Sequence, residues 1–582
     1  MLRRLVVGFL ATIGFCVLMI FAIGIGFWYW AEPATPRLAS GTVLTLDLSQ
    51  ALPDAPADHG LSQLLFPTPM SLAEAVNALE RAGDDPRVAG LVARIGDSSM
   101  GLGEVQELRD AIAAFRAKGK RAVAYADTFG ELSSGMRSYY LASAFDEIWL
   151  QPLGTVGLVG VRAELQFFRG TLDLLGVTPD FSHREEYKDA ANTVTETQMT
   201  APEREELQAV LQSVYDQIIE GIAIGRKIEP GAVKALVDRA PLLLDEAVKA
   251  HLVDHIGGRD DAIAALRGTD KLVGLDRYLQ IVGAPHQSGP TIALIYGTGL
   301  MARGKGGGNP LTNDNIMSAD EVTRAFRLAE ADKAVRAILF RIDSPGGSAV
   351  AAETIWASVK RARDAGKPVV VSMGDVAGSG GYYIAAPAAK IVAEPATLTG
   401  SIGVIAGKLV FGGLLKKIGG NSDSIQIGAN AGIFSIMNGF SPSERERLEA
   451  VLDDIYNTFK SRVAEGRKLD ANAVEAVAKG RVWSGADAKE RGLVDALGGM
   501  TTALGLAKEQ AGIRPDQDVN LKLYPPPKSN LDRLIARLGG NNGNDEDSVV
   551  TTRLRAVLQL VEQRLGLAAP PGTLTMRPLS VE

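Results

Sequence analysis

Amphipathic segments alternate with short apolar runs along most of the chain, and this alternation predicts helices and strands. Residues 71–82 and 319–331 place apolar side chains at helical spacing, and each segment leads into an apolar run. Residues 121–126 and 368–373 are further short apolar runs, each preceded by a second predicted helix. Strands that alternate with helices favour parallel βαβ units with right-handed crossovers. The pattern therefore predicts an α/β fold.

The predicted α/β pattern occurs twice. DKAVRAILFRI (332–342) repeats DPRVAGLVARI (85–95), and GLVDALGG (492–499) repeats HLVDHIGG (251–258). These and the intermediate matches keep their order, at offsets from 241 (492 minus 251) to 247 (332 minus 85), as small loop insertions would produce. An internal repeat of this kind indicates a tandem duplication of one fold.

The length of the chain also calls for more than one domain. A protein of 582 residues is too long for a single hydrophobic core. We expect an N-terminal repeat at residues 40–282 and a C-terminal repeat at 291–512, separated by a Gly- and Pro-rich linker. Residues 513–582 should form a tail with short amphipathic helices. Packing of this tail on the body is the simplest interpretation, and contact with a partner or a membrane surface is the alternative.

The N-terminus has the features of a membrane anchor. Arg3 and Arg4 precede an uncharged stretch, residues 5–30, which ends in the aromatic set FWYW. About 20 apolar residues span a bilayer, basic residues stay in the cytoplasm, and Trp and Tyr favour the interface. A cleaved signal would have a shorter apolar region and a small-residue cleavage site. Residues 1–31 therefore predict a cytoplasmic stub and an uncleaved transmembrane helix, with the body on the far side.

Composition and charge exclude few functions. The net charge of −7 gives no basic character that would suggest a nucleic acid as a partner. Cys16 is the only cysteine, so neither an intrachain disulfide nor a cysteine-based metal cluster can form.

Ser401 is the candidate nucleophile. It lies in LTGSIGV, after a β-like run and between Gly400 and Gly403. Glycines at these places let a side chain stand exposed on a sharp turn. The segment is not the G-x-S-x-G elbow of many hydrolases, because Thr399 occupies the leading glycine position. Taken alone, a serine in such a turn is structural more often than catalytic, so the hypothesis needs a base.

Two neighbouring motifs could complete a site. RIDSPGGSAV (341–350) follows an apolar strand and predicts a tight turn at a helix N-terminus, whose backbone amides suit an oxyanion. A plain strand-to-helix turn would also explain its Pro-Gly-Gly. Ser379 lies between glycines in GDVAGSGGYY and is a rival nucleophile, although close packing is the simpler explanation of these small residues.

A lysine is the candidate base. No histidine follows His286, so the C-terminal half offers no histidine beyond that residue for a Ser-His-Asp triad. A neutral lysine is an alternative base, and burial can lower its pKa because it disfavours the charged form. Lys188, in REEYKDAAN, could supply this amine. A solvated lysine among charged neighbours is the alternative interpretation.

The duplication links this lysine to the serine. At the offset of the neighbouring matches, Lys188 corresponds to Ala431, in GANAGIFS. Ser401 in turn corresponds to Thr155, in LGTVG. Each repeat has therefore kept one half of a possible Ser/Lys pair.

Together these motifs resemble one family, the long form of signal peptide peptidase A, also called protease IV. The matching motifs are RIDSPGGS, VAGSGGYY, LTGSIGV, EYKDAAN and GRVWSGADAKERGLVD. The resemblance extends over nearly the whole chain after the predicted anchor. It implies two tandem copies of a fold similar to the Clp protease subunit and the crotonases. It also implies an enzyme of the bacterial cytoplasmic membrane whose catalytic body lies on the periplasmic side.

The resemblance further implies a role for individual residues. The nucleophile falls on Ser401 and the general base on Lys188. The oxyanion donors fall on the backbone N–H groups of Gly347 and Ile402, and a serine that positions the lysine falls on Ser435. No metal or cofactor is needed.

The implied activity is the degradation of cleaved signal peptides and other small peptides, with a preference for small or apolar side chains near the cut. The implied partners are these peptides, the bilayer through residues 5–30, and copies of the chain in a homotetramer. Two other classes remain open. A crotonase-like acyl-CoA enzyme would also use an oxyanion turn, and a non-catalytic membrane scaffold could keep the duplicated fold for assembly alone.

Overall fold

The computed structural model describes residue 19 and residues 38–56, 69–131, 133–266, 271–304, 316–526 and 573–575. Within these ranges, no helix is both long and apolar enough to cross a membrane. Apart from Met19, the predicted anchor at residues 5–30 lies outside the described residues. The same holds for most of the predicted tail, including its expected amphipathic helices.

The N-terminal repeat is built on a six-stranded sheet in the order β6-β4-β3-β2-β1-β7, with every neighbouring pair parallel. Its strands are β1 (Thr42–Leu48), β2 (Val88–Ile95), β3 (Arg121–Ala126), β4 (Glu147–Leu150), β6 (His255–Ile256) and β7 (Leu272–Gly274). The helices around it are α2 (Leu72–Asp84), α3 (Leu102–Ala117), α4 (Met136–Ala142), α8 (Pro230–Val237), α9 (Leu244–Lys249), α10 (Arg259–Ala264) and α11 (Leu275–Val282).

The C-terminal repeat follows the same plan. Its main sheet has the order β17-β15-β13-β11-β8-β19, with β14 also paired to β13 and β18 paired to β14, and only the β15–β17 pair is antiparallel. The strands are β8 (Thr291–Thr298), β11 (Val335–Ser344), β13 (Val369–Gly378), β14 (Lys390–Ala393), β15 (Leu398–Gly400), β17 (Val482–Ser484), β18 (Ala496–Leu497) and β19 (Asn520–Leu523). The helices are α12 (Ala319–Ala331), α13 (Ala349–Asp364), α14 (Gly380–Ala385), α17 (Ala471–Val477), α18 (Gly485–Glu490) and α19 (Met500–Gln510). The predicted duplicated α/β architecture is confirmed.

Each repeat also extends an arm away from its sheet. The N-terminal arm contains α5 (Arg169–Leu175), β5 (Thr178–His183) and α6 (Asn192–Thr195), and the long helix α7 (Ala201–Arg226) leads back to the body. The C-terminal arm consists of β16 (Ile405–Val410), α15 (Gly412–Lys417), an irregular segment, and the long helix α16 (Pro442–Arg467). Thr200 and Ser441 begin the long helices with the same capping box, to Glu203 and Glu444, so one sequence signal sets both.

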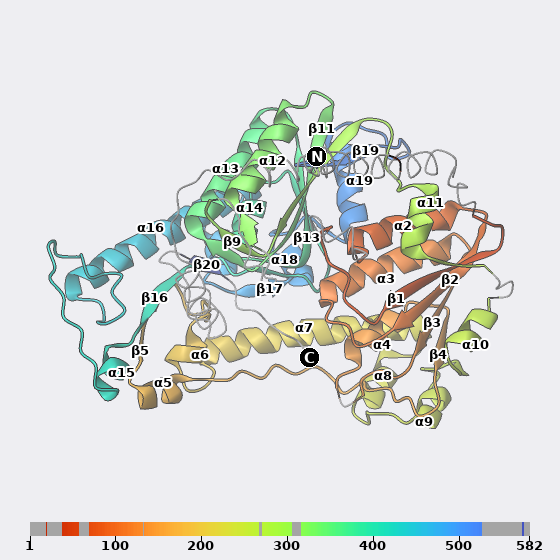
Figure 1. The fold of residues 1–582 in the computed structure, drawn as a ribbon, viewed down its shortest axis with the longest axis horizontal. Helices are drawn as coiled ribbons and strands as arrows, with labels where there is room; N and C mark the ends of the chain where they lie inside the picture. The colour runs from red at the N-terminus through yellow and green to blue at the C-terminus, as the bar shows by residue number, and fades with distance from the viewer. Residues whose placement is uncertain are drawn as a thin grey trace, which may run out of the picture.

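The two arms meet at one end of the molecule (Figure 1). There β5 of the N-terminal arm pairs antiparallel with β16 of the C-terminal arm, over six residue pairs. This pair is part of a third sheet, in the order β10-β9-β12-β20-β16-β5. Its other strands are β9 (Leu300–Ala302), β10 (Ile316–Ser318), β12 (Gly346–Ser348) and β20 (Thr573–Thr575). The N-terminal arm therefore carries its residues onto the C-terminal repeat.

A buried ion network joins the bodies of the two repeats. Arg341 on β11 is almost fully buried, and its guanidinium donates to Asp54 and Glu107 of the N-terminal repeat at 2.6 and 2.8 Å. Glu107 also accepts from the backbone N–H of Met500, at 2.7 Å. Ions removed from water in this way cost free energy unless each keeps its partners. The network therefore fixes the register of one repeat on the other.

We predict that Arg341→Met, which keeps most of the volume but leaves two buried carboxylates unpaired, lowers the free energy of unfolding by about 3–5 kcal/mol. Urea unfolding of the detergent-solubilised chain measures this. Arg361→Met is the control, because Arg361 pairs with Glu330 at the surface and should cost under about 1 kcal/mol. Equal losses in the two variants would show that the network does not hold the repeats together.

Candidate active site

Ser401 lies at the turn between β15 and β16, at the inner end of the C-terminal arm. The turn puts Gly400 at φ 78° and Ser401 at φ 51°, and the latter value is costly for a residue with a side chain. A side chain at Gly400 would come within 2.8 Å of the Trp483 ring, which explains the glycine. The Ser401 N–H donates to the Arg481 carbonyl at 2.7 Å, so the surroundings hold this strained conformation in place.

Lys188 reaches Ser401 from the other repeat. It follows β5 on the N-terminal arm, and its side chain passes close to Gly403 and Gly480 of the C-terminal repeat. A side chain at either of these two positions would come within 3.1 or 2.8 Å, respectively, of Lys188 side-chain atoms. Its Nζ lies 2.9 Å from Ser401 Oγ and 3.1 Å from the Ser401 carbonyl oxygen. Both residues are only 2% exposed. The structure thus brings together the two residues that the duplication had left in separate repeats.

Burial changes the protonation of this amine. Desolvation lowers the pKa of Lys188 from 10.5 to about 7, although the nearby carboxylates Asp189 and Glu206 favour the charged form. Burial in turn raises the pKa of Glu206. At neutral pH a large fraction of Lys188 is therefore uncharged. An uncharged amine has two N–H groups and one lone pair, and the lone pair can take the Ser401 hydroxyl proton.

Ser379 is the third polar group at the amine. It precedes α14 at φ 53°, its N–H donates to the Gly400 carbonyl at 2.8 Å, and its Oγ lies 3.0 Å from Lys188 Nζ. The sequence had offered Ser379 as a rival nucleophile, whereas the structure puts it beside Ser401 around one lysine. Ser435 lies instead in the C-terminal arm, where its Oγ accepts from the backbone N–H of Met437 at 3.2 Å.

The turn expected to hold an oxyanion forms β12. Gly347 is buried there at φ 151°, and a side chain at this position would come within 2.2 Å of the Met301 carbonyl oxygen. The N–H of Gly346 is used within the turn, where it donates to Ser344 Oγ at 3.1 Å. The Ile402 side chain is fully buried in the core, and its carbonyl accepts from Gly480.

The edge of β12 carries a short strand from the C-terminal region. Residues 573–575 (β20) pair antiparallel with β12, with Leu574 opposite Gly347, and Thr573 also pairs with Ile405 on β16. β12 contains Gly347, and β16 follows Ser401. The extended segment 573–575 therefore lies between the two strands that flank the site. Sequence patterns gave no sign of this strand, since three residues show no periodicity.

The corresponding place in the N-terminal repeat lacks these features. Thr155 replaces Ser401 and lies 3.3 Å from the Thr128 hydroxyl. Met100 occupies the position of Gly347 and is buried. Across the described ranges, no group of three or more His, Cys, Asp or Glu side chains could hold a metal ion.

Comparisons with known proteins find relatives of both repeats. A model of "Peptidase family S49" matches residues 114–273 and 361–514, one segment in each repeat. "Serine protease SPPA, chloroplastic" from Arabidopsis thaliana is 31% identical, over 87% of this chain and 74% of that protein. "Protease 4" from Salmonella typhi is 30% identical, over 89% of this chain and 86% of that protein. One solved structure, of a mutant of the "1510-N membrane-bound stomatin-specific protease", covers 41% of this chain and 99% of its own, at 16% identity and a TM-score of 0.26.

The matched segments define the class of the protein as a serine peptidase. The chain belongs to Peptidase family S49, and the resemblance to protease IV that the motifs predicted is confirmed.

The lowered pKa of Lys188 predicts the pH dependence of peptidase activity. If the uncharged amine is the active form, kcat/KM should rise with pH through about 7 and level off above it, because protons leave Lys188 over that range. An ordinary lysine would place this rise near pH 10. Initial rates on a small peptide between pH 5 and 10 give the midpoint.

Asp343 needs a control in this experiment, because burial also raises its pKa and it lies just before the oxyanion turn. Its carboxylate accepts from the Val376 N–H at 2.9 Å, and the amide oxygen of Asp343→Asn can do the same. The rise near pH 7 should persist in this variant. Loss of the rise would assign the titration to Asp343 and not to Lys188.

Proposed function

We propose that the protein is an endopeptidase in which Ser401 is the nucleophile and Lys188 the general base. The observation that carries this proposal is the 2.9 Å contact between Lys188 Nζ and Ser401 Oγ, buried at the junction of the repeats. A serine hydroxyl needs a base to become a nucleophile, and a desolvated lysine can act as that base near neutral pH.

The reaction proceeds in two stages. Lys188 takes the Ser401 proton as the serine oxygen attacks the peptide carbonyl carbon, and the resulting oxyanion accepts hydrogen bonds from backbone N–H groups, with Gly347 and Ile402 as the expected donors. The ammonium of Lys188 then protonates the leaving amine, and the C–N bond breaks to give an acyl-enzyme. Water attacks the ester carbonyl carbon and Lys188 takes its proton. Lys188 then returns this proton to Ser401 Oγ as the ester C–O bond breaks, so the acid product leaves and both groups are restored.

Extended peptides are the proposed substrates. The position of residues 573–575 between β12 and β16 supports this, because it demonstrates that a polypeptide backbone fits there as an antiparallel strand. Cleaved signal peptides and other small peptides, expected from the resemblance, are short and unfolded enough to enter such a slot. The alternating β and α elements of each repeat are compatible with the expected likeness to the Clp protease subunit and the crotonases.

The cellular setting is part of the proposal. Residues 5–30 would anchor the chain in the bacterial cytoplasmic membrane, with both repeats on the periplasmic side, and copies of the chain would assemble as a homotetramer. An anchored peptidase would meet cleaved signal peptides where they remain, in the bilayer. Neither a cofactor nor a metal enters the proposed chemistry.

Single substitutions test the proposed pair. Ser401→Ala and Lys188→Met should each lower kcat by about 10⁴-fold or more, because each removes an indispensable partner in proton transfer and attack. The double variant should lose little more than either single one. Turnover of a fluorogenic peptide measures this, and an activity within tenfold of the wild type in either variant would contradict the assignment.

Ser379 is proposed as a positioning residue for the lysine. Its hydroxyl accepts from Lys188 and favours the charged amine, so Ser379→Ala should lower kcat by about tenfold and move the midpoint of the pH profile to lower pH. Ser435→Ala is the matched control and should change neither quantity. A reversed outcome, with the effect at Ser435, would assign positioning to the arm.

A further inference from the structure

A hollow of about 700 Å³ lies in the N-terminal repeat, against the body of the C-terminal repeat. Its N-terminal walls are the turn at residues 96–102 after β2, residues 133–141 in and before α4, Val161, and one side of α7. The remaining wall comes from β13 and the start of β15 in the C-terminal repeat. The turn follows the carboxyl end of a parallel strand, which is where ligands of α/β folds commonly bind.

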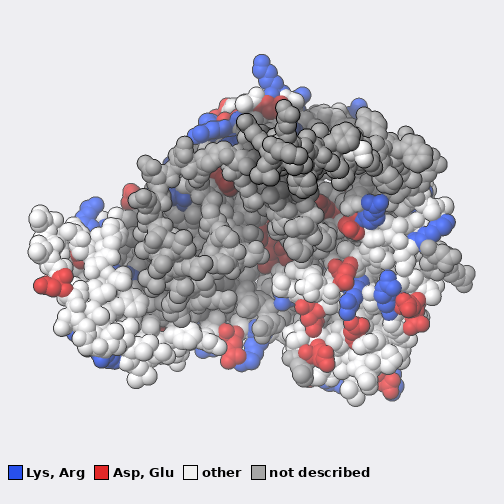
Figure 2. Space-filling model, in the orientation of Figure 1, with Lys and Arg blue, Asp and Glu red and all other residues white. Residues whose placement is uncertain are grey.

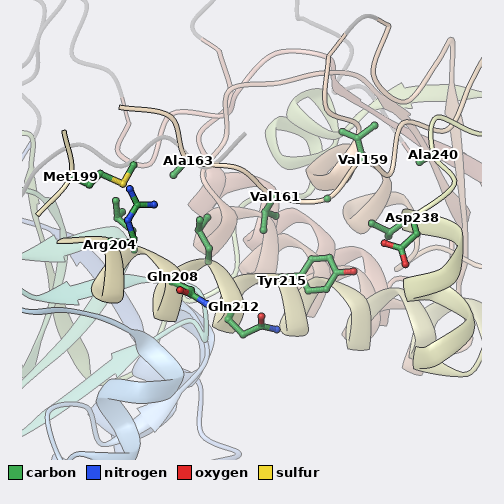
Figure 3. A pocket seen from close by; sticks show the side chains of 14 residues that line it. Val159, Val161, Ala163, Met199, Arg204, Gln208, Gln212, Tyr215, Asp238 and Ala240 are labelled. Carbon is green, nitrogen blue, oxygen red and sulfur yellow. The ribbon is translucent and has the colours of Figure 1, made fainter. Parts of the chain in front are cut away.

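The duplication shows what this hollow corresponds to. Its turn matches the turn that contains β12, and Val161 lies in residues 159–164, which match β16. In the C-terminal repeat, residues 573–575 lie between β12 and β16 as a strand. The hollow therefore occupies the place in the N-terminal repeat that a polypeptide strand fills in the C-terminal repeat. Figure 3 views a neighbouring hollow that shares Val161, and it shows this side chain above helix α7.

The turn of the hollow has backbone groups available for pairing. In the C-terminal repeat, Gly346 and Gly347 pair with the strand at residues 573–575. The corresponding Ser99 and Met100 form no backbone–backbone hydrogen bond within the part of the chain that the structure describes. An extended peptide that enters the hollow can pair with these two residues in the same way.

The hollow has lost catalytic groups and kept an apolar lining. Met100 stands in place of Gly347, and Met136 stands in place of Ser379, at an offset of 243 (379 minus 136). Both methionines line the hollow, and their flexible thioether side chains adapt to ligands of different shape. The other large apolar residues of the lining are Leu102, Val105, Leu141, Val214, Ile218 and Leu398. By contrast, Figure 2 shows acidic and basic side chains interspersed over the outer surface of the N-terminal repeat, at the lower right.

Polar contacts hold the walls of the hollow in place. Arg137, at the start of α4, donates to the Met100 carbonyl oxygen at 2.7 Å and so joins the helix to the turn. Asp97, in the turn, accepts from the hydroxyls of Ser133 and Ser138 at 3.2 and 3.3 Å. The hollow is therefore preformed, and a ligand does not have to open it.

The wall from the C-terminal repeat connects the hollow to the candidate active site. Asp375 on β13 accepts from the Gly103 N–H of α3 at 2.9 Å, which fixes this wall on the N-terminal repeat. Leu398 begins β15, and Ser401 follows the end of that strand. Three residues of a strand span about 10 Å, so the hollow and Ser401 lie about this far apart along β15.

We propose that this hollow, which we call the N-terminal slot, binds the apolar stretch of a peptide substrate as an extended strand and does not cleave it. A long peptide occupies the slot and the Ser401–Lys188 site together. The slot then holds the rest of the peptide near Ser401 and raises its local concentration there. This inference rests on the proposed function, because it gives the same class of substrate a second place to bind.

Photo-cross-linking tests the slot without catalysis. The probe is a 12-residue peptide of Leu and Ala with one benzophenone side chain, which on irradiation inserts into nearby C–H bonds and prefers those of methionine. It is added to the full Lys188→Met chain in lipid nanodiscs. Peptide mapping should find the label on Met100 or Met136, and an excess of the peptide without benzophenone should remove it. A label on neither methionine, or one that does not respond to competition, would overturn the slot.

Peptide length tests whether the slot serves catalysis. Ser99 is exposed at the slot, so Ser99→Trp puts an indole ring there with little effect on the core. Extended peptides of 12 and 4 residues are about 40 and 13 Å long, and only the longer one spans the slot and Ser401. Ser99→Trp should therefore raise KM about tenfold more for the 12-residue peptide than for the 4-residue one, and it should lower the cross-linking to a similar extent.

Ser461→Trp is the matched control, because Ser461 is exposed on α16 and does not line the slot. It should change neither KM nor the cross-linking. Equal changes of KM for the two peptides in Ser99→Trp would overturn the joint occupancy of slot and active site. A wild-type chain that cleaves neither peptide would overturn the proposed function instead, and the cross-linking would still decide whether the slot binds peptides.

Discussion

The burial of one lysine amine at the junction of two repeats is the constraint on which the proposed chemistry depends. Lys188 lies within hydrogen-bond distance of Ser401 only because β5 pairs with β16 and carries the N-terminal arm onto the C-terminal repeat. The same contact removes water from the amine, and desolvation is the largest cause of its lowered pKa. Position and protonation therefore have one origin, which is the packing of one repeat on the other.

The duplication explains why neither repeat would act alone in the proposed mechanism. The C-terminal repeat keeps the proposed oxyanion turn and Ser401, whereas the N-terminal repeat keeps Lys188 and has Met100 at the position of Gly347. The Arg341 network fixes the bodies of the two repeats. When each site is formed between two repeats, a catalytic group lost from one repeat disables only the site that contains this group. Divergence of this kind therefore leaves the other site intact.

Much of this arrangement could be predicted from the sequence, for identifiable reasons. Long elements with clear periodicity gave the α/β fold, and the ordered matches gave the duplication. The repeat offset linked Lys188 to Ser401, although REEYKDAAN itself resembles a solvated segment. Burial of Lys188 depends on Gly403 and Gly480, which are distant in sequence. The contact between Ser379 and Lys188 depends on the positive φ angle of Ser379, which no local sequence pattern reveals. The strand β20 is too short to show periodicity.

The proposed mechanism depends most directly on the charge state of Lys188. Lysine labelled with ¹³C at Cε gives a resonance that reports this charge directly, and Lys188→Met identifies the signal by its loss. In the Ser401→Ala chain, the proposed mechanism predicts a titration midpoint well below that of an ordinary lysine, near pH 7. A midpoint near 10.5 would mean that the amine stays charged at neutral pH, and it would contradict the role of Lys188 as the base.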